Sequence, residues 1–115
     1  MKLGIISDYN DGPIAQALQL IYKSFGYEVE RFPQNEFQPK YVSEQSLDAL
    51  LIEGRSDSDE GFAIAVRRNV PEGTKMAYLF YRPKPSQDLR TYNIEALDIL
   101  DEQLKEKFTK WTGGS

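Results

Sequence analysis

The stretch that decides the fold is Leu3-Gly4-Ile5-Ile6-Ser7-Asp8, an apolar run that ends in a carboxylate. It shows no polar alternation, which is typical of a strand buried on both faces of a sheet. A turn follows at residues 10–13, and a second strand is predicted over residues 27–32. Between them, one apolar helix face is formed at regular spacing by Ile14, Leu18, Ile21 and Phe25. A strand, a helix and a strand in this order predict a βαβ unit with parallel strands and a right-handed crossover.

The middle of the chain continues the alternation of strands and helices. Residues 47–52 predict a third, buried strand, and a short helix is expected before it over residues 42–47. A helix over residues 60–69 leads into a fourth strand at residues 76–81. This order indicates a three-layer α/β fold with a parallel sheet, in which ligands bind at the carboxyl ends of the strands.

The C-terminal part of the chain carries a long apolar stripe. Its members, at near-helical spacing, are Leu97, Leu100, Leu104, Phe108 and Trp111. The stripe predicts one amphipathic helix over residues 94–111, with Asn93 as its N-cap. We expect this helix to cover one face of the sheet, and the alternative is a helix that docks a partner. A single domain is expected over residues 1–111, with 112–115 as a linker or an added tail.

Composition excludes several kinds of chemistry. The 115 residues include no Cys and no His, so thiolate catalysis, disulfides, Cys-based metal sites and a Ser-His-Asp triad are ruled out. The net charge is −4, and residues 1–57 hold nine acidic and only five basic side chains. This balance argues against nucleic acid as a partner. The sequence has no apolar run long enough to span a membrane, and its start does not resemble a signal peptide, so we expect a cytoplasmic protein.

Acidic side chains gather where the predicted strands end. The residues expected at this edge of the sheet are Asp8, Asp11, Glu53, Asp57, Asp59 and Tyr81. Two carboxylates at neighbouring strand ends repel each other, and a Mg²⁺ ion relieves that repulsion, so Asp8 and Glu53 form the candidate metal pair. The alternative is that these acids are solvated and cap nearby helices. The sequence contains neither of the glycine-rich phosphate-binding motifs.

The order of these residues resembles the receiver domain of two-component response regulators, over residues 2 to 82. The matching pieces are the first strand at 2–8, Phe25-Gly26-Tyr27-Glu28-Val29, the run at 48–53, and Asp59-Glu60-Gly61-Phe62. The resemblance implies a flavodoxin-like parallel sheet with strand order 2-1-3-4, and a fifth strand beyond. The chain after residue 82 is short by one α/β unit, so we expect four to five strands.

The departures from the receiver pattern decide the function that the resemblance implies. Ser7 replaces one acid of the family's acidic pair, and Glu53 stands where the family has its phospho-accepting Asp. Phe80 falls near the position of a small hydroxyl residue, and the only Lys-Pro pair is at Lys84. A Glu displaces the attacking carboxylate by a methylene group, and such positioning errors are costly. The resemblance therefore implies a pseudo-receiver without enzymatic activity or cofactor, whose degenerate phospho-pocket consists of Ser7, Asp8, Glu53, Phe80 and Lys84.

We expect such a domain to act in signalling through protein recognition, with a protein partner or a second copy as a homodimer. An exposed last strand is expected to contribute to an aromatic interface made of Tyr78, Phe80, Tyr81, Tyr92, Phe108 and Trp111. Two alternatives stay open. The opening residues 5–9 and Gly26–Val29 also resemble the N-terminal, nucleotide-handling part of a glycosyltransferase or an ATP-grasp ligase. A flavin could instead stack on Tyr9, Tyr81 and Trp111.

Overall fold

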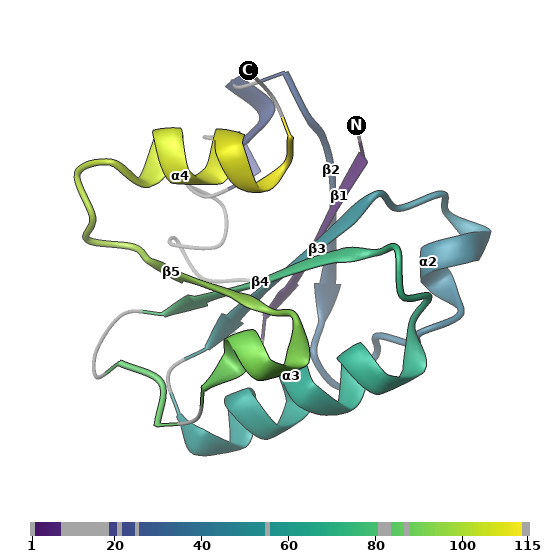
Figure 1. The fold of residues 1–115 in the computed structure, drawn as a ribbon. Coiled ribbons are helices and arrows are strands. Elements are labelled where there is room, and N and C mark those ends of the chain that lie inside the picture. The colour runs from purple at the N-terminus through teal and green to yellow at the C-terminus, as the bar shows by residue number, and fades with distance from the viewer. Residues whose placement is uncertain are drawn as a thin grey trace.

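A computed structural model describes residues 2–7, 19–20, 22–24, 26–54, 56–80, 84–86 and 88–113. Five parallel strands form one sheet in the order β2-β1-β3-β4-β5 (Figure 1). The strands are β1 (Lys2–Ser7), β2 (Glu28–Pro33), β3 (Ala49–Gly54), β4 (Lys75–Phe80) and β5 (Glu95–Asp98). The helices are α2 (Tyr41–Glu44), α3 (Asp57–Asn69), the 3-10 turn η1 (Leu89–Tyr92) and α4 (Leu104–Trp111). The predicted parallel sheet and its strand order are confirmed.

The sheet has a separate hydrophobic core on each face, because successive side chains of a strand point to opposite sides. On one face, Ile52 and Tyr78 pack with residues of α2, α3 and η1. On the other face, Leu51 and Leu79 pack with Phe108 of α4. Figure 1 shows α3 and α4 on opposite sides of the sheet. Every residue of β3 is buried, as expected for the central strand of such a sheet.

The predicted helix over residues 94–111 is wrong. Residues 95–98 form β5, and the helix that follows is α4, which begins only at Leu104. Asn93 is not an N-cap; it has a left-handed backbone with φ 60° and ends η1. A four-residue strand is too short to show the alternation of apolar and polar residues that marks a strand. Leu97 of β5 faces the core, and its spacing to Leu100 and Leu104 also fits a helix.

The expectation that Tyr78 and Phe80 lie on an exposed last strand is wrong, because a fifth strand, which the sequence analysis allowed, follows β4. β5 pairs with β4 along its outer side, from Ala77↔Glu95 to Phe80↔Asp98. The side chains of Tyr78 and Phe80 are buried in the core beneath α3 and η1. Within the described ranges, no helix has the length and apolar character needed to span a lipid bilayer.

The end of α4 is fixed by an aromatic cluster on its side of the sheet. Phe108 is fully buried and stacks on Tyr22, with ring centroids 4.3 Å apart. Tyr27 packs edge-on against Phe108 at 5.3 Å, and Trp111 lies against it at 5.4 Å. The hydroxyls of Tyr27 and Thr112 are 2.8 Å apart, so the chain just beyond α4 is tied to the start of β2. These contacts hold the helix against its face of the sheet.

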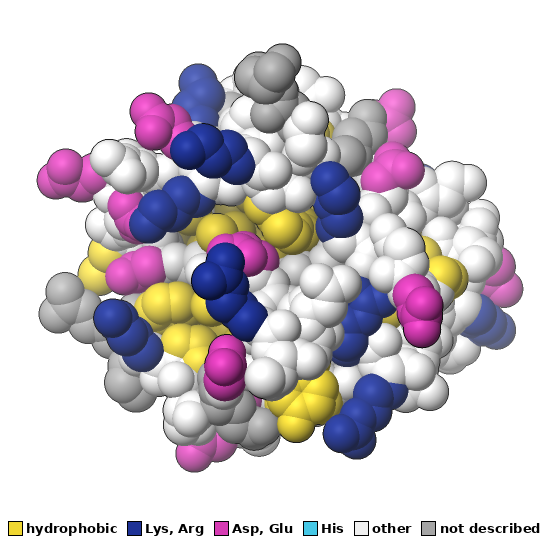
Figure 2. Space-filling model, viewed as in Figure 1, with side chains coloured by type: hydrophobic (Ala, Val, Ile, Leu, Met, Phe, Trp, Pro, Cys, Tyr) yellow, Lys and Arg dark blue, Asp and Glu magenta, His cyan; other side chains and the backbone are white. Residues whose placement is uncertain are grey.

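On the molecular face seen in Figure 2, hydrophobic side chains show between charged ones.

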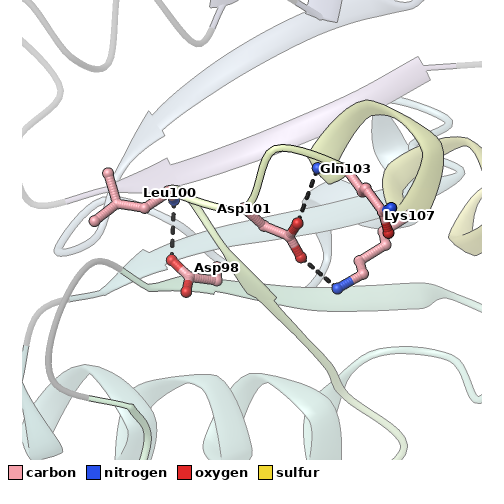
Figure 3. A network of polar contacts seen from close by, with 5 residues as sticks. All are labelled: Asp98, Leu100, Asp101, Gln103 and Lys107. Atoms are coloured by element: carbon pink, nitrogen blue, oxygen red, sulfur yellow. Dashed lines mark hydrogen bonds and ion pairs between the residues drawn. The ribbon is translucent and has the colours of Figure 1, made fainter.

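The turn between β5 and α4 is organised by two aspartates (Figure 3). Asp98 Oδ1 accepts a hydrogen bond from the backbone N–H of Leu100, and Asp101 Oδ1 accepts one from that of Gln103. Asp101 also accepts a hydrogen bond from the ammonium of Lys107, one turn into α4. The bonds from Lys107 and Gln103 lower the pKa of Asp101, and the bond to Asp101 raises the pKa of Lys107. The turn therefore fixes where α4 begins.

Candidate functional site

The central strands bring Ser7 and Glu53 together at the carboxyl edge of the sheet. β1 and β3 pair in parallel with Ile6 opposite Ile52, so the next residue of each strand lies side by side. The hydroxyl of Ser7 donates a hydrogen bond of 3.2 Å to Glu53 Oε2, and both residues are only 1% exposed. A buried carboxylate is costly unless it is hydrogen-bonded, so this contact is part of what allows Glu53 to end a central strand.

The ring of Tyr78 lies over Gly54, the last residue of β3. Gly54 directly follows Glu53 in the chain. A Cβ placed on Gly54 would be 2.0 Å from the Tyr78 hydroxyl and 2.3 Å from two ring carbons. No side chain fits there, so glycine is required at this position for the ring to pack. The hydroxyl of Tyr78 reaches to 3.5 Å from the carbonyl oxygen of Ser56. The loop between β3 and α3 therefore closes over an aromatic side chain.

Acidic side chains at the start of α3 are held by neighbouring polar groups. Asp59 accepts hydrogen bonds from Gln34 Nε2 at 3.3 Å and from Ser56 Oγ at 3.2 Å, and is 3% exposed. Glu60 is equally buried, and the hydroxyl of Ser86 lies 3.4 Å from both of its carboxylate oxygens. Negative charge at a helix N-terminus is stabilised by the helix dipole. These contacts connect the loops at this edge. Glu60 was not a candidate in the sequence because it falls on the expected helix.

The cavity at this edge is small. It is about 30 Å³ in volume and is lined by Gly54, Ser56, Asp57, Glu60, Tyr78, Lys84 and Pro85. A space of this size holds about one water molecule. This cavity is therefore too small to hold a nucleotide or a flavin.

The structure separates the residues of the predicted phospho-pocket. Ser7 and Glu53 are in contact, but Phe80 pairs in register with Gly54 and packs in the core under α3. Glu53 pairs instead with Leu79, whose side chain belongs to the opposite core. Lys84 is exposed beside the small cavity. Phe80 therefore does not line a common pocket with Glu53.

The predicted metal pair is only half within the described residues, because Asp8 lies outside them. In the parts of the chain that are described, no three Asp or Glu side chains are grouped so that they could hold a metal ion. A Mg²⁺ ion on Asp8 and Glu53 thus stays a prediction.

The predicted aromatic interface divides into buried and accessible members. Phe108, Tyr78 and Phe80 are buried in the two cores, whereas Tyr92 and Trp111 are partly exposed. Tyr81 lies outside the described residues. Tyr78 and Phe80 are buried because they face the core under α3 and η1, and Phe108 is buried because it packs on Tyr22, neither of which the sequence revealed. The three buried rings offer no surface to a partner.

Comparison with known proteins identifies the fold. No family model matches the chain, and no curated protein does so either. Two similar solved structures are cysteine-to-alanine and cysteine-to-serine mutants of flavodoxin from Pseudomonas aeruginosa, with TM-scores of 0.56 and 0.55. The sequence identities are 12% and 13%, and each match covers 98% of this chain and 95% of the flavodoxin. The chain has a flavodoxin-like fold. At these identities the likeness shows the fold alone.

A larger cavity lies at the other end of the flavodoxin-like sheet, where β4 and β5 begin. It is about 450 Å³ in volume, and its lining residues are Glu72, Gly73, Thr74, Lys75, Met76, Arg90, Asn93, Ile94, Glu95 and Trp111. Trp111 therefore lies at the amino edge of the sheet, and Tyr9 and Tyr81, the other two rings of the flavin alternative, lie outside the described residues. Sequence reasoning missed this cavity because its walls come from segments far apart in the chain and from no recognisable motif.

Proposed function

We propose that this flavodoxin-like domain recognises a protein partner and does not carry a phosphoryl group. The observation that carries the proposal is the environment of Glu53. This residue stands at the position that the receiver resemblance assigns to the phospho-acceptor, and its carboxylate is 1% exposed and bonded to Ser7 Oγ at 3.2 Å.

Phosphoryl transfer to a carboxylate needs a nucleophile that can approach the donor in line, and cationic groups that neutralise the developing charge. A buried Glu53 that accepts a hydrogen bond is poorly placed for such an approach. Ser7 supplies a hydroxyl donor where the receiver pattern has an acid, so it adds no negative charge that would attract Mg²⁺. The same pair instead closes the edge of the sheet as a structural contact.

Amide NMR spectra test this part of the proposal. The ¹⁵N-labelled domain is titrated with Mg²⁺ and then with beryllofluoride, which imitates a phosphoryl group on a carboxylate. The expected result is no saturable shift at the amides of Ser7, Glu53 and Gly54. A saturable shift that disappears in Glu53→Gln would overturn the proposal, because it would show a working phospho-pocket at that carboxylate.

The surface proposed for the partner is the outer edge of β5. No strand among the described residues pairs with this side of β5, so its backbone groups can accept an additional strand. Leu100, two residues after the end of β5, is 61% exposed, and Tyr92 and Trp111 are partly exposed on neighbouring elements. Two copies paired antiparallel and in full register through β5 would place Glu95 opposite Asp98. Like charges directly opposite each other are destabilising, so we favour a different protein with a basic extended segment.

Selection of peptides from a displayed library tests the proposed partner surface. Extended peptides rich in Lys and Arg are expected to bind, and Leu100→Asp is expected to abolish their binding. Leu20→Asp is the matched control, because Leu20 is 68% exposed in the helical segment after β1. Equal loss in both variants would contradict docking at β5. A dimer in sedimentation equilibrium that Leu100→Asp dissociates would show that the partner is a second copy.

A further inference from the structure

The amino edge of the sheet holds a cavity of about 450 Å³. Cavities that bind small molecules typically measure about 300–1,000 Å³. The walls are the turn before β4, the segment from η1 into β5, and the end of α4. Figure 2 shows the face where α4 and β5 run, and hydrophobic, acidic and basic side chains meet there. This site lies at the opposite edge of the sheet from Glu53, and it shares Glu95 and Trp111 with the surroundings of the proposed partner surface.

Among the described residues that line this cavity, Trp111 is the aromatic one. Its ring is held from behind by the fully buried Phe108, at a centroid distance of 5.4 Å, and is itself partly exposed. An indole at the wall of a cavity can stack on a planar ring of a ligand. Stacking of such rings adds to the stabilisation that burial alone provides.

The charged groups of the lining are not equally available to a ligand. Burial lowers the pKa of Arg67, and the negative charge of the nearby Glu72 raises it. Glu72 thus interacts with a cation of the protein. Arg90 and Glu95 form a loose ion pair at 3.7 Å, in which the Arg90 side chain remains 77% exposed. The acids are therefore partly balanced by cations of the protein itself.

Lys75 is the cation best placed for an anionic ligand. It is exposed at the start of β4, and within the described part of the chain no carboxylate forms an ion pair with it. A Cβ built on Gly113 would be 3.0 Å from Lys75 Nζ, so the ammonium lies just beyond the carboxyl end of α4. The helix dipole favours a cation at that end. The ammonium therefore lies near the end of α4, whose last residue is Trp111.

We propose that this cavity binds a nucleoside monophosphate. The base stacks on Trp111, the phosphate pairs with Lys75 and Arg90, and a ribose hydroxyl donates a hydrogen bond to Glu95. Each part of the ligand thereby meets a group of matching chemistry: an aromatic face, two cations and a carboxylate. The lining has as many carboxylates as cations, so the site does not attract anions by charge alone, and the base is needed for binding.

Trp111 is the only tryptophan of the chain, so its fluorescence reports this site directly. The wild-type protein is titrated with AMP, adenosine and inorganic phosphate in separate samples. The expected result is saturable quenching by AMP, with adenosine binding about tenfold more weakly because it lacks the phosphate. Inorganic phosphate is expected to leave the fluorescence unchanged and not to displace AMP. Absence of saturable quenching by AMP, or displacement of AMP by phosphate at equal concentration, would overturn the proposal.

Two lysine variants separate a specific site from general charge attraction. Lys75→Ala is expected to weaken AMP binding about tenfold or more, since it removes a charge-assisted contact. Lys40→Ala is the matched control, because Lys40 is also exposed but lies beside α2, away from the cavity. It changes the net charge equally and should leave AMP binding unchanged. Equal weakening in both variants would contradict the proposed site. Circular dichroism checks that both variants keep the fold.

Discussion

Replacing Gly54 by alanine tests the geometry at the carboxyl edge most sharply. The added methyl carbon would lie 2.0 Å from the Tyr78 hydroxyl, whereas ordinary contacts of a Cβ are 3.4–4 Å. Tyr78 is only 2% exposed, so its ring can escape the overlap only by leaving the core or by pushing β3 aside. Exposing an aromatic side chain costs about 1.5–3 kcal/mol, and overpacking a core costs about 1–3 kcal/mol. We therefore expect Gly54→Ala to destabilise the domain by about 2–3 kcal/mol.

Urea unfolding followed by Trp111 fluorescence measures this change. A loss of about 2–3 kcal/mol in the free energy of unfolding lowers the urea concentration at the unfolding midpoint by about 1–2 M, given the typical dependence of that free energy on urea for a small domain. Gly61→Ala is the matched control: a Cβ on Gly61 would meet nothing within 4 Å, and the residue lies inside α3. It should stabilise the domain by about 0.5–1 kcal/mol. In a Tyr78→Leu background the cost of Gly54→Ala should nearly vanish. An unfolding free energy of Gly54→Ala within about 0.5 kcal/mol of wild type would refute the proposed packing.

Three further predictions concern the cores and the turn before α4. Phe108→Ala should lower the unfolding free energy by about 3–5 kcal/mol in urea denaturation, and a much smaller loss would mean that α4 does not cover the sheet. Ser7→Ala should cost about 1.5–3 kcal/mol because it removes a hydrogen bond to the buried Glu53 carboxylate, whereas the exposed Ser43→Ala should be nearly neutral. The pKa of Asp101 is lower in the folded state, so its contribution is present above the ordinary aspartate pKa and is lost as the pH falls through the folded value. Asp101→Asn should remove that part of the acid dependence of unfolding, and an unchanged profile would speak against the turn.

The sheet could be predicted from the sequence because its central strands are unbroken apolar runs with helical spacing between them. The run at 47–52 identified the central strand to within two residues of β3. The C-terminal part could not be assigned in the same way. Leu97, Leu100 and Leu104 are spaced as on one helix face, yet they lie on a strand, a turn and a helix respectively. Periodicity alone cannot locate a boundary inside such a series.

The candidate site was predictable only in part. Placing Glu53 at a strand end followed from the apolar run before it, and the structure adds the hydrogen bond from Ser7. The side on which Phe80 packs depends on the register of β4, which the sequence does not fix. The cavity beside Trp111 and Lys75 depends on how α4 turns back over the sheet, and no local pattern encodes that contact.

The most direct test of the central claim is the intact mass of the domain after incubation with acetyl phosphate and Mg²⁺. The mass is expected to stay unchanged, because the Glu53 carboxylate is buried and bonded to Ser7. A phosphoryl adduct that peptide mapping assigns to Glu53 would contradict the account, since it would show that this carboxylate reaches a phosphoryl donor.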